Sequence, residues 1–300
     1  MTKRQQHIAD LLLLFVTCVW GASFILMKRT VESLAPSQYL AIRFILASII
    51  LFIIFFKRIK TIKRNELLYG FIIGIFLFLG MILQVIGLQF TYASKSAFIT
   101  GLTVVLVPIF VAIIFRKLPK INVFIGVILA FFGIWLLNGA KLNGFNLGDT
   151  LTFISDLAFV AQIIAIDVFT SKKDINSINT ALIQISTAAV LFTAFSLFFE
   201  RKPLNFGLFN TVSIITILVT GVLGTALAFT IQVVVQKYTT PTHTALIFSA
   251  EPVFGAIFAS IIPSSNGQVE ILSLISYIGC FLILLGNLSA EFEFKWSEKR

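Results

Sequence analysis

Ten apolar runs, each long enough to cross a lipid bilayer, constrain this chain more than any other feature of its sequence. A transmembrane helix needs about 20 such residues to span a hydrocarbon core of about 30 Å. Cutting at charges, prolines and polar clusters gives ten segments of suitable length: 8–27, 36–56, 66–88, 92–115, 121–139, 147–170, 177–199, 211–236, 239–262 and 269–290. We therefore predict an all-α integral membrane protein with ten transmembrane helices, embedded in a lipid bilayer.

The composition excludes the soluble alternatives. The chain is 58% hydrophobic and 12% charged, whereas soluble domains carry about 25% charged residues. A soluble enzyme, a disordered chain and a secreted disulfide scaffold are all excluded. The net charge of +10 does not indicate a nucleic-acid partner, because most Lys and Arg residues lie in short gaps between the apolar segments. Cys18 and Cys280 lie far apart and have no metal-binding spacing, and we predict no metal and no cofactor.

The Lys and Arg residues between the segments predict the orientation, because cytoplasmic loops carry an excess of them. If the N-terminus is cytoplasmic, the cytoplasmic segments hold 16 Lys and Arg residues and the outer segments hold five. We expect a multi-pass protein of the cell's inner (plasma) membrane, with both termini in the cytoplasm.

The two halves of the chain resemble each other. Residues 84–99 read QVIGLQFTYASKSAFI, and residues 232–247, 148 positions later, read QVVVQKYTTPTHTALI. The fifth and tenth segments share a pair of glycines seven residues apart, at 126 and 133 and at 279 and 286. Apolar helices can resemble each other by composition alone, but glutamine and threonine also match here. After four extra residues in the first half, Pro108 pairs with Pro252.

Each half holds five segments, an odd number, so the second copy enters the membrane from the opposite side. We predict two inverted five-helix repeats, in residues 1–140 and 147–290, followed by a short cytoplasmic tail in 291–300. Inverted repeats of this kind are typical of alternating-access carriers.

Five short motifs together resemble the EamA branch of the drug/metabolite transporter superfamily over practically the whole chain. They are Trp20-Gly21-Ala22-Ser23-Phe24, Arg43-Phe44, residues 93–102 leading to Pro108, Gly148-Asp149, and Ser249-Ala250-Glu251-Pro252-Val253. The resemblance implies two five-helix repeats, cytoplasmic termini, and a central cavity lined by segments 1, 3, 4, 6, 8 and 9. Relatives often carry Gly-Glu soon after segments four and nine. This chain has RKLP at 116–119 and PSSN at 263–266, so no role of those glutamates is transferred.

Glu251 is the sharpest functional candidate, because ionisable side chains in hydrocarbon are costly. At about 1.5 Å per residue, counting from Thr239 puts it about 18 Å deep, near the midplane. Pro252 removes a backbone donor and weakens the helix beside it. A carbonyl freed there, together with the carboxylate, could bind a cation, a proton or a substrate ammonium. The alternative is a structural acid bonded to a neighbouring helix.

Four other ionisable residues are candidates for coupling or gating. Arg43 and Asp156 lie at similar depths, about 10–14 Å from the outer end by the helical rise, so they could form an ion pair that acts as a clamp or outer gate. Lys95 is expected near the outer mouth and its repeat mate His243 near the inner mouth. Lys95 has a second interpretation, a side chain that extends to the interface, and His243 could be structural.

Polar and aromatic residues of the predicted cavity have two interpretations each. Gln84, Gln162 and Gln232 could bind a zwitterionic or heterocyclic solute, or could bond one helix to another. Trp20 could stack on a ligand or merely pack. The candidate cavity residues are Trp20, Ser23, Gln84, Gly101, Gln162, Gln232, Ser249 and Glu251, with helix breaks expected at Pro108 and Pro252.

These residues favour a carrier over two alternatives. A membrane enzyme acting on a lipid or isoprenoid would need a catalytic cluster, and the sequence has only two histidines and no P-loop or HExxH motif. A channel would need a selectivity-filter segment. We predict a transporter that exports or exchanges a small metabolite, amino acid-like or a related polar or amphipathic solute. The expected partners are that solute, the bilayer and, if transport is coupled, protons, and the protein is expected to be a monomer or homodimer.

Overall fold

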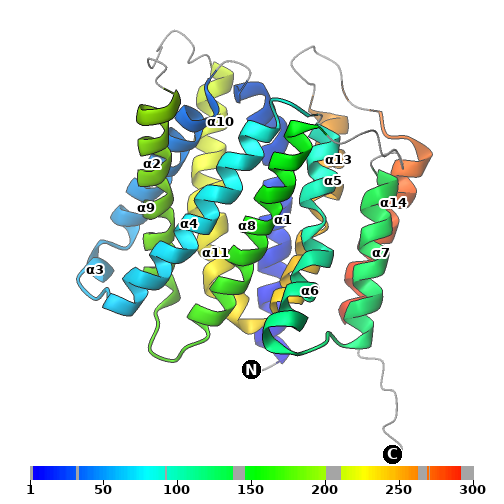
Figure 1. The fold of residues 1–300 in the computed structure, drawn as a ribbon, viewed down its shortest axis with the longest axis horizontal. Helices are drawn as coiled ribbons and strands as arrows, with labels where there is room; N and C mark the ends of the chain where they lie inside the picture. The colour runs from blue at the N-terminus through cyan, green and yellow to red at the C-terminus, as the bar shows by residue number, and fades with distance from the viewer. Residues whose placement is uncertain are drawn as a thin grey trace, which may run out of the picture.

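The computed structural model describes residues 3–31, 34–91, 93–137, 146–200, 211–262, 269 and 271–291. Throughout these ranges the chain is helical with short connections, and the helices run side by side in one bundle (Figure 1). The all-α fold predicted from the sequence is therefore confirmed.

The helices of the first half are α1 (Lys3–Val31), α2 (Pro36–Ile54), α3 (Phe56–Ile59), α4 (Arg64–Gly87), α5 (Ala93–Thr100), α6 (Thr103–Phe115) and α7 (Ile121–Leu137). Those of the second half are α8 (Leu147–Thr170), α9 (Ser177–Phe195), α10 (Thr211–Gly221), α11 (Ala228–Val235), α12 (Pro241–Phe248), α13 (Glu251–Ile261) and α14 (Leu274–Glu291). Two π-helical stretches, η1 (Ser196–Glu200) and η3 (Val222–Leu227), and a 3-10 turn, η4 (Gln236–Tyr238), complete the second half.

The ten predicted spans all correspond to apolar helices. Among the described residues, eight helical spans are long and apolar enough to cross a membrane, and Ile121–Leu137 and Leu274–Ala290 are shorter apolar helices. Two spans expected to be single helices are not. Segment 92–115 consists of α5 and α6, and segment 239–262 consists of α12 and α13.

The two interrupted spans break at equivalent positions. The helix stops at Gly101–Leu102 between α5 and α6, and at Ser249–Ala250 between α12 and α13, 148 positions later. Pro252 is the second residue of α13, directly after its break. Pro108, in contrast, lies inside α6. The prediction of a helix break at Pro108 is therefore wrong. The first repeat breaks seven residues earlier, at Gly101, which has no side chain.

Equivalent helices of the two halves pack against each other in opposite directions. The hydroxyl of Ser37, at the start of α2, bonds to the carboxylate of Glu200, which ends η1 after α9. Eleven residues further along α2, the hydroxyl oxygen of Ser48 lies 2.8 Å from that of Ser186, which precedes Glu200 in the chain. α2 and α9 are the second spans of the two halves, and their antiparallel contact shows that the repeats are inverted.

The fifth and tenth spans meet through their shared glycines. A Cβ atom added to Gly126 would lie 2.6 Å from the carbonyl oxygen of Gly286, and one added to Gly133 would lie 2.7 Å from that of Gly279. The backbones of α7 and α14 therefore approach more closely than side chains would allow, as small residues permit between membrane helices. The seven-residue glycine spacing predicted this face on each helix.

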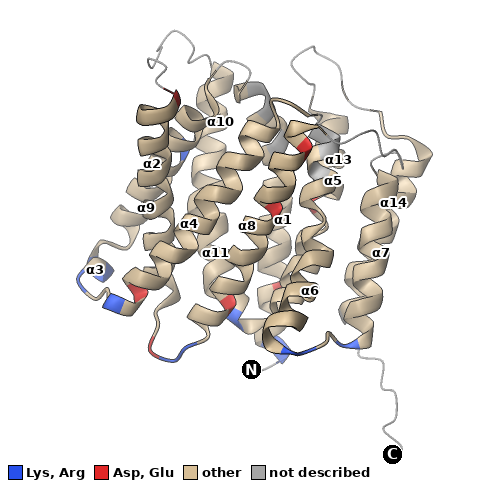
Figure 2. Cartoon of the chain, in the orientation of Figure 1, with Lys and Arg blue, Asp and Glu red and all other residues tan. Residues whose placement is uncertain are grey.

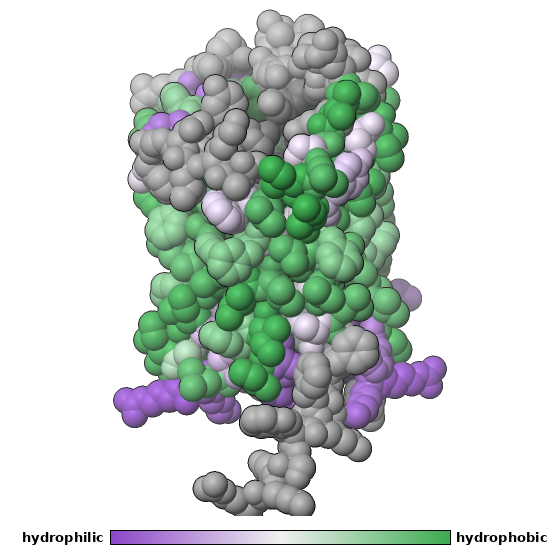
Figure 3. Space-filling model, turned by 90° about the vertical axis from the view of Figure 1, so that its right-hand side faces the viewer, coloured by the Kyte–Doolittle hydropathy of each residue, from purple (hydrophilic) through white to green (hydrophobic). Residues whose placement is uncertain are grey.

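The surface is apolar along the sides and basic at one end. Large apolar side chains such as Ile53, Ile113 and Phe281 are 64–72% exposed, and an apolar belt covers the side that carries α7 and α14 (Figure 3). Lys and Arg residues at 57–64, 116–120 and 172–173 lie at the end where α1 begins (Figure 2), which we call the basic end. Such a belt suits contact with lipid tails.

Candidate functional site

Trp20 lies inside the bundle, where α1 meets helices of the second repeat. Its ring centroid is 5.0 Å from that of Phe229 on α11 and 5.0 Å from that of Phe248 at the end of α12. The indole Nε1 donates a 2.9 Å hydrogen bond to the carbonyl oxygen of Gly224. Trp20 is half-buried, so part of this aromatic surface stays accessible.

The π-helical stretch η3 receives side chains from both α1 and α2. The carbonyl oxygen of Gly224 accepts from Trp20 and also from Arg43 Nη2 at 3.2 Å. A Cβ atom on Gly224 would lie 3.1 Å from the hydroxyl oxygen of Ser23 and 3.3 Å from Arg43 Nη2. Glycine at this position therefore leaves room for Ser23 and Arg43, and its carbonyl accepts from Trp20 and Arg43. The Ser23 hydroxyl itself donates to the Val19 carbonyl oxygen of its own helix at 2.7 Å. π-Helical stretches occur frequently at functional sites.

Arg43 is bound by neutral acceptors. Its side chain is 3% exposed, and Nε donates to the hydroxyl oxygen of Thr225 at 2.6 Å. Nη2 donates to the Gly224 carbonyl, and both acceptors belong to η3. The predicted ion pair with Asp156 is wrong, because the described contacts of Arg43 are on η3 and those of Asp156 are on α6. Equal depth did not place the two side chains on facing surfaces.

Asp156 is fully buried on α8. Its Oδ1 is hydrogen-bonded to the hydroxyl of Thr103, the first residue of α6. The neighbouring Ser155 donates to the carbonyl oxygen of Gly80 at 2.7 Å and so joins α8 to α4. Asp156 therefore lies directly beside the helix break of the first repeat.

Glu251 begins α13, directly after the break of the second repeat. Its backbone lies against α1, because a Cβ atom on Gly21 would be 2.8 Å from the Glu251 carbonyl oxygen and 2.7 Å from Phe254 Cβ. The Glu251 side chain is half-buried. Residues 20–23 of α1 thus have Arg43 and η3 on one side and the α12–α13 break on another. We call Trp20, Ser23, Arg43, Gly224 and Glu251 the central cluster.

Ser249 and Gly101 mark the two breaks but are held by other contacts. The hydroxyl of Ser249 donates to the Leu246 carbonyl oxygen at 2.6 Å and receives Asn287 Nδ2 of α14 at 3.3 Å. A Cβ atom on Gly101 would lie 2.9 Å from Ile134 Cδ1 of α7. Both residues therefore contact the α7–α14 pair, not the central cluster.

The three predicted glutamines form helix-to-helix contacts. Gln84 Nε2 donates to the Thr100 hydroxyl at 3.2 Å. Gln162 and Gln232 are buried, and their amide groups lie 3.4 Å apart between α8 and α11. Gln236, which the sequence analysis did not select, donates to the Ile163 carbonyl oxygen at 2.6 Å. These contacts favour the structural interpretation of the amides in this conformation.

One of the gating candidates at the ends of the bundle, His243, lies near an acidic side chain. His243 Nε2 lies 4.0 Å from Asp10 Oδ1 of α1. Asp10 was not predicted, although an acid within the first apolar run was a visible signal. The side chain of Lys95 lies outside the described residues. Asp149 caps α8 together with Asn146 and accepts a 2.6 Å bond from Thr91.

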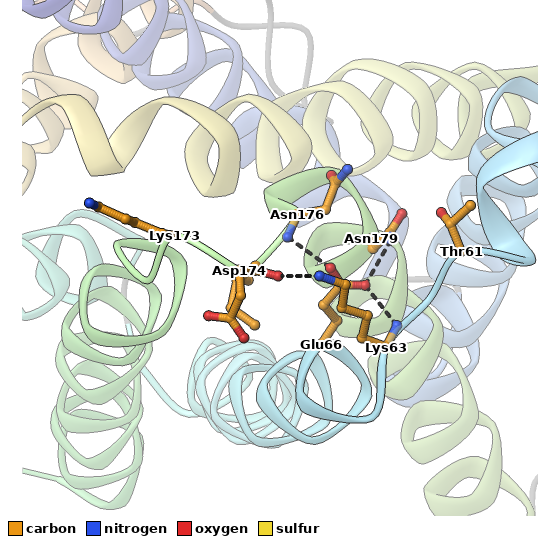
Figure 4. Close-up of a pocket in the computed structure, with 8 residues that line it drawn as sticks. Thr61, Lys63, Glu66, Lys173, Asp174, Asn176 and Asn179 are labelled. Carbon is orange, nitrogen blue, oxygen red and sulfur yellow. Dashed lines mark hydrogen bonds between the residues drawn. The ribbon is translucent and has the colours of Figure 1, made fainter.

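A pocket of about 330 Å³ opens at the basic end, away from the central cluster (Figure 4). The buried carboxylate of Glu66 accepts from the backbone N–H groups of Lys63 and Asn176, at 2.9 and 2.8 Å, and from Asn179 Nδ2 at 2.8 Å. Lys63 Nζ reaches the Asp174 carbonyl oxygen at 3.1 Å. These bonds tie the connection before α4 to the one before α9, which gives Glu66 a structural role that the sequence analysis missed.

Two oppositely oriented sets of five spans around a buried polar cluster are a construction found in membrane transporters. Residues 7–139 and 146–288 each match the EamA-like transporter family. The chain belongs to the EamA-like transporter family.

Known relatives are consistent with this assignment. An uncharacterized transporter of Archaeoglobus fulgidus is 34% identical over 277 residues, covering 92% of this chain and 83% of the relative. The uncharacterized transporter YoaV of Bacillus subtilis is 24% identical, covering 93% and 95% of the two chains. A crystal structure with 16% sequence identity superposes with a TM-score of 0.75 over 95% of this chain and 96% of the other, which shows the fold alone.

Proposed function

We propose that this protein is a secondary carrier that exports or exchanges a small polar or amphipathic organic solute, amino acid-like or related, by alternating access. The proposal rests mainly on one observation: the first span of each repeat makes equivalent contacts with the other repeat. α1 packs on α12 and α13, whereas its counterpart α8 packs on α5 and α6. Each first span therefore lies against the broken span of the other repeat. Because the two sets of contacts are similar, states open at either end can have similar energies.

The central cluster suits a solute with an apolar body and charged or polar groups. The Arg43 side chain binds η3, and the Glu251 backbone lies against Gly21; in this proposal the two residues supply opposite charges to the solute. Trp20, with Phe229 and Phe248 beside it, supplies aromatic surface. Such a combination of apolar lining and a few placed polar groups is typical of small-molecule sites. In this proposal the half-buried Glu251 carboxylate contacts a donor group of the solute.

The basic end would face the cytoplasm of a cell with this protein in its inner (plasma) membrane. Lys and Arg residues gather at this end in three connections, and such residues are retained on the cytoplasmic side. α1 begins and α14 ends there, in agreement with both termini being cytoplasmic.

A two-stage experiment tests the proposal. A thermal-shift screen of the purified protein against metabolites identifies a stabilising solute, because ligands that bind the folded state raise its apparent stability. The same solute is then used in proteoliposomes. A carrier shows saturable counterflow, a channel shows flux without counterflow, and an enzyme alters the solute chemically; either of the last two results would refute the proposal.

Glu251→Gln tests the site within that experiment. It should weaken the solute-induced thermal shift and slow counterflow, because the amide removes the negative charge. Asp174→Asn makes the same chemical change in an exposed connection and should behave as wild type. Equal solute shifts in wild type and Glu251→Gln would remove Glu251 from the site.

A further inference from the structure

If Asp156 is ionised, the single hydroxyl hydrogen of Thr103 cannot serve both of the acceptors, Thr100 O and Asp156 Oδ1, that lie within hydrogen-bond distance of it. The hydroxyl oxygen of Thr103 lies 2.6 Å from the carbonyl oxygen of Thr100 and is also hydrogen-bonded to Asp156 Oδ1. A threonine hydroxyl has one hydrogen to donate and can accept through its lone pairs. If it donates to Thr100, the Asp156 carboxyl group must supply the hydrogen of the second bond. The arrangement is therefore satisfied when Asp156 carries a proton.

The burial of Asp156 favours the same assignment. The residue has no exposed surface, and Oδ2 has no hydrogen-bond partner among the described residues. An ionised carboxylate with one oxygen buried and unbonded would be far more costly than a neutral carboxyl group in that position. Arg43, the cation expected to neutralise it, binds η3 instead.

A line of polar side chains leads from the end opposite the basic end to Asp156. On α8, Asp149, Thr152 and Asp156 follow each other at helical spacing on one face and are all fully buried. Across from them, Thr91 bonds to Asp149 and Ser96 lies 3.5 Å from the Thr152 hydroxyl. We call these residues, with Thr103, the α8 polar seam. Hydroxyl and carboxyl groups in such a series can pass a proton between them.

Asp156 lies beside the first helix break as Glu251 lies beside the second. Thr103 is the first residue of α6 and Glu251 the first of α13, 148 positions later, so both helix breaks lie beside an acid. At the second break the acid belongs to the broken span itself, and at the first it comes from α8 of the other repeat. A carboxylate formed at Asp156 would face the N-terminus of α6, whose dipole stabilises negative charge.

We propose that Asp156 is a proton-binding site of this protein, reached through the α8 polar seam. The proposal rests on the proposed carrier function only for its use in coupling. In the conformation seen here, Asp156 holds a proton on its carboxyl group. When water reaches the seam, the O–H bond of Asp156 breaks, the proton passes to water, and the carboxylate remains at the start of α6. Proton binding and the geometry of the α5–α6 break are thereby linked.

Other titratable groups on the elements around α8 are Arg64, Glu66 and Tyr69 of α4, Lys237 and Tyr238 of η4, and His243 of α12. The neighbouring helix α5 also carries Lys95, whose side chain lies outside the described residues. Neither α6 nor α11 contains a titratable residue. On α8 itself, Asp167 lies eleven residues beyond Asp156, about 16 Å along the helix. The contact of Asp156 is with Thr103.

Infrared spectroscopy of the purified protein at neutral pH, without solute, tests the protonation. A protonated carboxyl group has a C=O stretching band that a carboxylate lacks. Asp156→Asn should remove one such band, and the matched control Asp167→Asn on the same helix should keep it. An unchanged protonated-carboxyl region in Asp156→Asn would overturn the proposal. Because no transport is measured, failure of the carrier proposal would leave this result standing.

Isotope labelling gives the same test without a mutation. In wild-type protein made with aspartate ¹³C-labelled at the side-chain carboxyl, the band should shift, whereas a band from Glu251 would not. The absence of any shifted protonated-carboxyl band would refute the assignment to Asp156, even if Asp156→Asn failed to fold.

Exchange into D₂O tests the seam. Thr152→Val removes the hydroxyl between Asp149 and Asp156 and should slow the deuterium shift of the Asp156 band. Thr170→Val removes a similarly buried hydroxyl at the other end of α8 and should leave the rate unchanged. Equal exchange rates in Thr152→Val and wild type would exclude this route to Asp156.

Discussion

Replacing Gly279 by alanine should push α14 slightly away from α7 and destabilise the protein. The added Cβ atom would lie 2.4 Å from the backbone nitrogen of Leu137, 2.6 Å from the Gly133 carbonyl oxygen and 2.9 Å from Leu137 Cα. All three are backbone atoms, so no flexible side chain can move aside. Since non-bonded carbon atoms pack best at about 3.5–4.0 Å, the two helices must move apart by about 1 Å.

The magnitude follows from two opposing effects. Forcing an extra methyl group into a well-packed contact costs about 1–3 kcal/mol. Alanine is favoured over glycine inside a helix by about 1 kcal/mol. Gly255→Ala isolates the second effect, because Gly255 is also inside a helix and its added Cβ would lie 3.7 Å from the nearest atom, the Gly21 carbonyl oxygen. We expect Gly279→Ala to be less stable than Gly255→Ala by about 1–3 kcal/mol.

Thermal unfolding in detergent provides the assay. A thiol-reactive fluorophore reports the exposure of Cys18 and Cys280, both partly buried thiols in apolar helices, as the protein is heated. Gly279→Ala should unfold at a lower temperature than wild type, and Gly255→Ala at the same temperature or slightly higher. If the two variants unfolded together, the close backbone contact between α7 and α14 would not be a determinant of stability.

Two further substitutions test buried polar contacts by the same unfolding assay. Arg43→Lys loses the guanidinium geometry that reaches both Gly224 and Thr225. It should cost about 1.5–3 kcal/mol, as for hydrogen bonds to charged groups; an unchanged unfolding temperature would contradict this. Glu66→Gln points an amide N–H₂ at donors such as Asn179 and should cost about 1–3 kcal/mol. Limited proteolysis should then cut the connection before α9 faster than in wild type, and an equal rate would contradict the role of Glu66.

The fold was largely predictable because the bilayer imposes a simple length requirement. Ten apolar runs of suitable length became ten spans, and the glycines at 126, 133, 279 and 286 predicted the faces along which α7 and α14 meet. A seven-residue spacing returns nearly to the same side of a helix. Orientation of the repeats followed from their odd number of spans, and the antiparallel α2–α9 contact agrees with it.

The side-chain contacts were harder to predict, because position along a span gives depth but not direction. Arg43 and Asp156 were placed at similar depths, yet their bonds run to η3 and to α6. Which way each residue faces depends on helix packing. In addition, the π-helical stretch η3 turns the residues of its span to other directions than a continuous α-helix would. No single-residue signal in the sequence identified η3, whose residues are apolar or small.

The interruptions of the helices explain where the polar residues gather. Inside a bilayer, backbone groups that lose their helical partners cannot turn to water and must be satisfied by the protein. Among the described residues, η3 and the breaks at Gly101–Leu102 and Ser249–Ala250 interrupt spans internally, whereas η1 and η4 lie at the ends of theirs. Trp20 and Arg43 donate to the first, Asp156 lies at the second, and Glu251 follows the third. Because a change in helix geometry at these points would change the partners of each polar group, the same residues that satisfy the interruptions are positioned to respond to a solute or a proton.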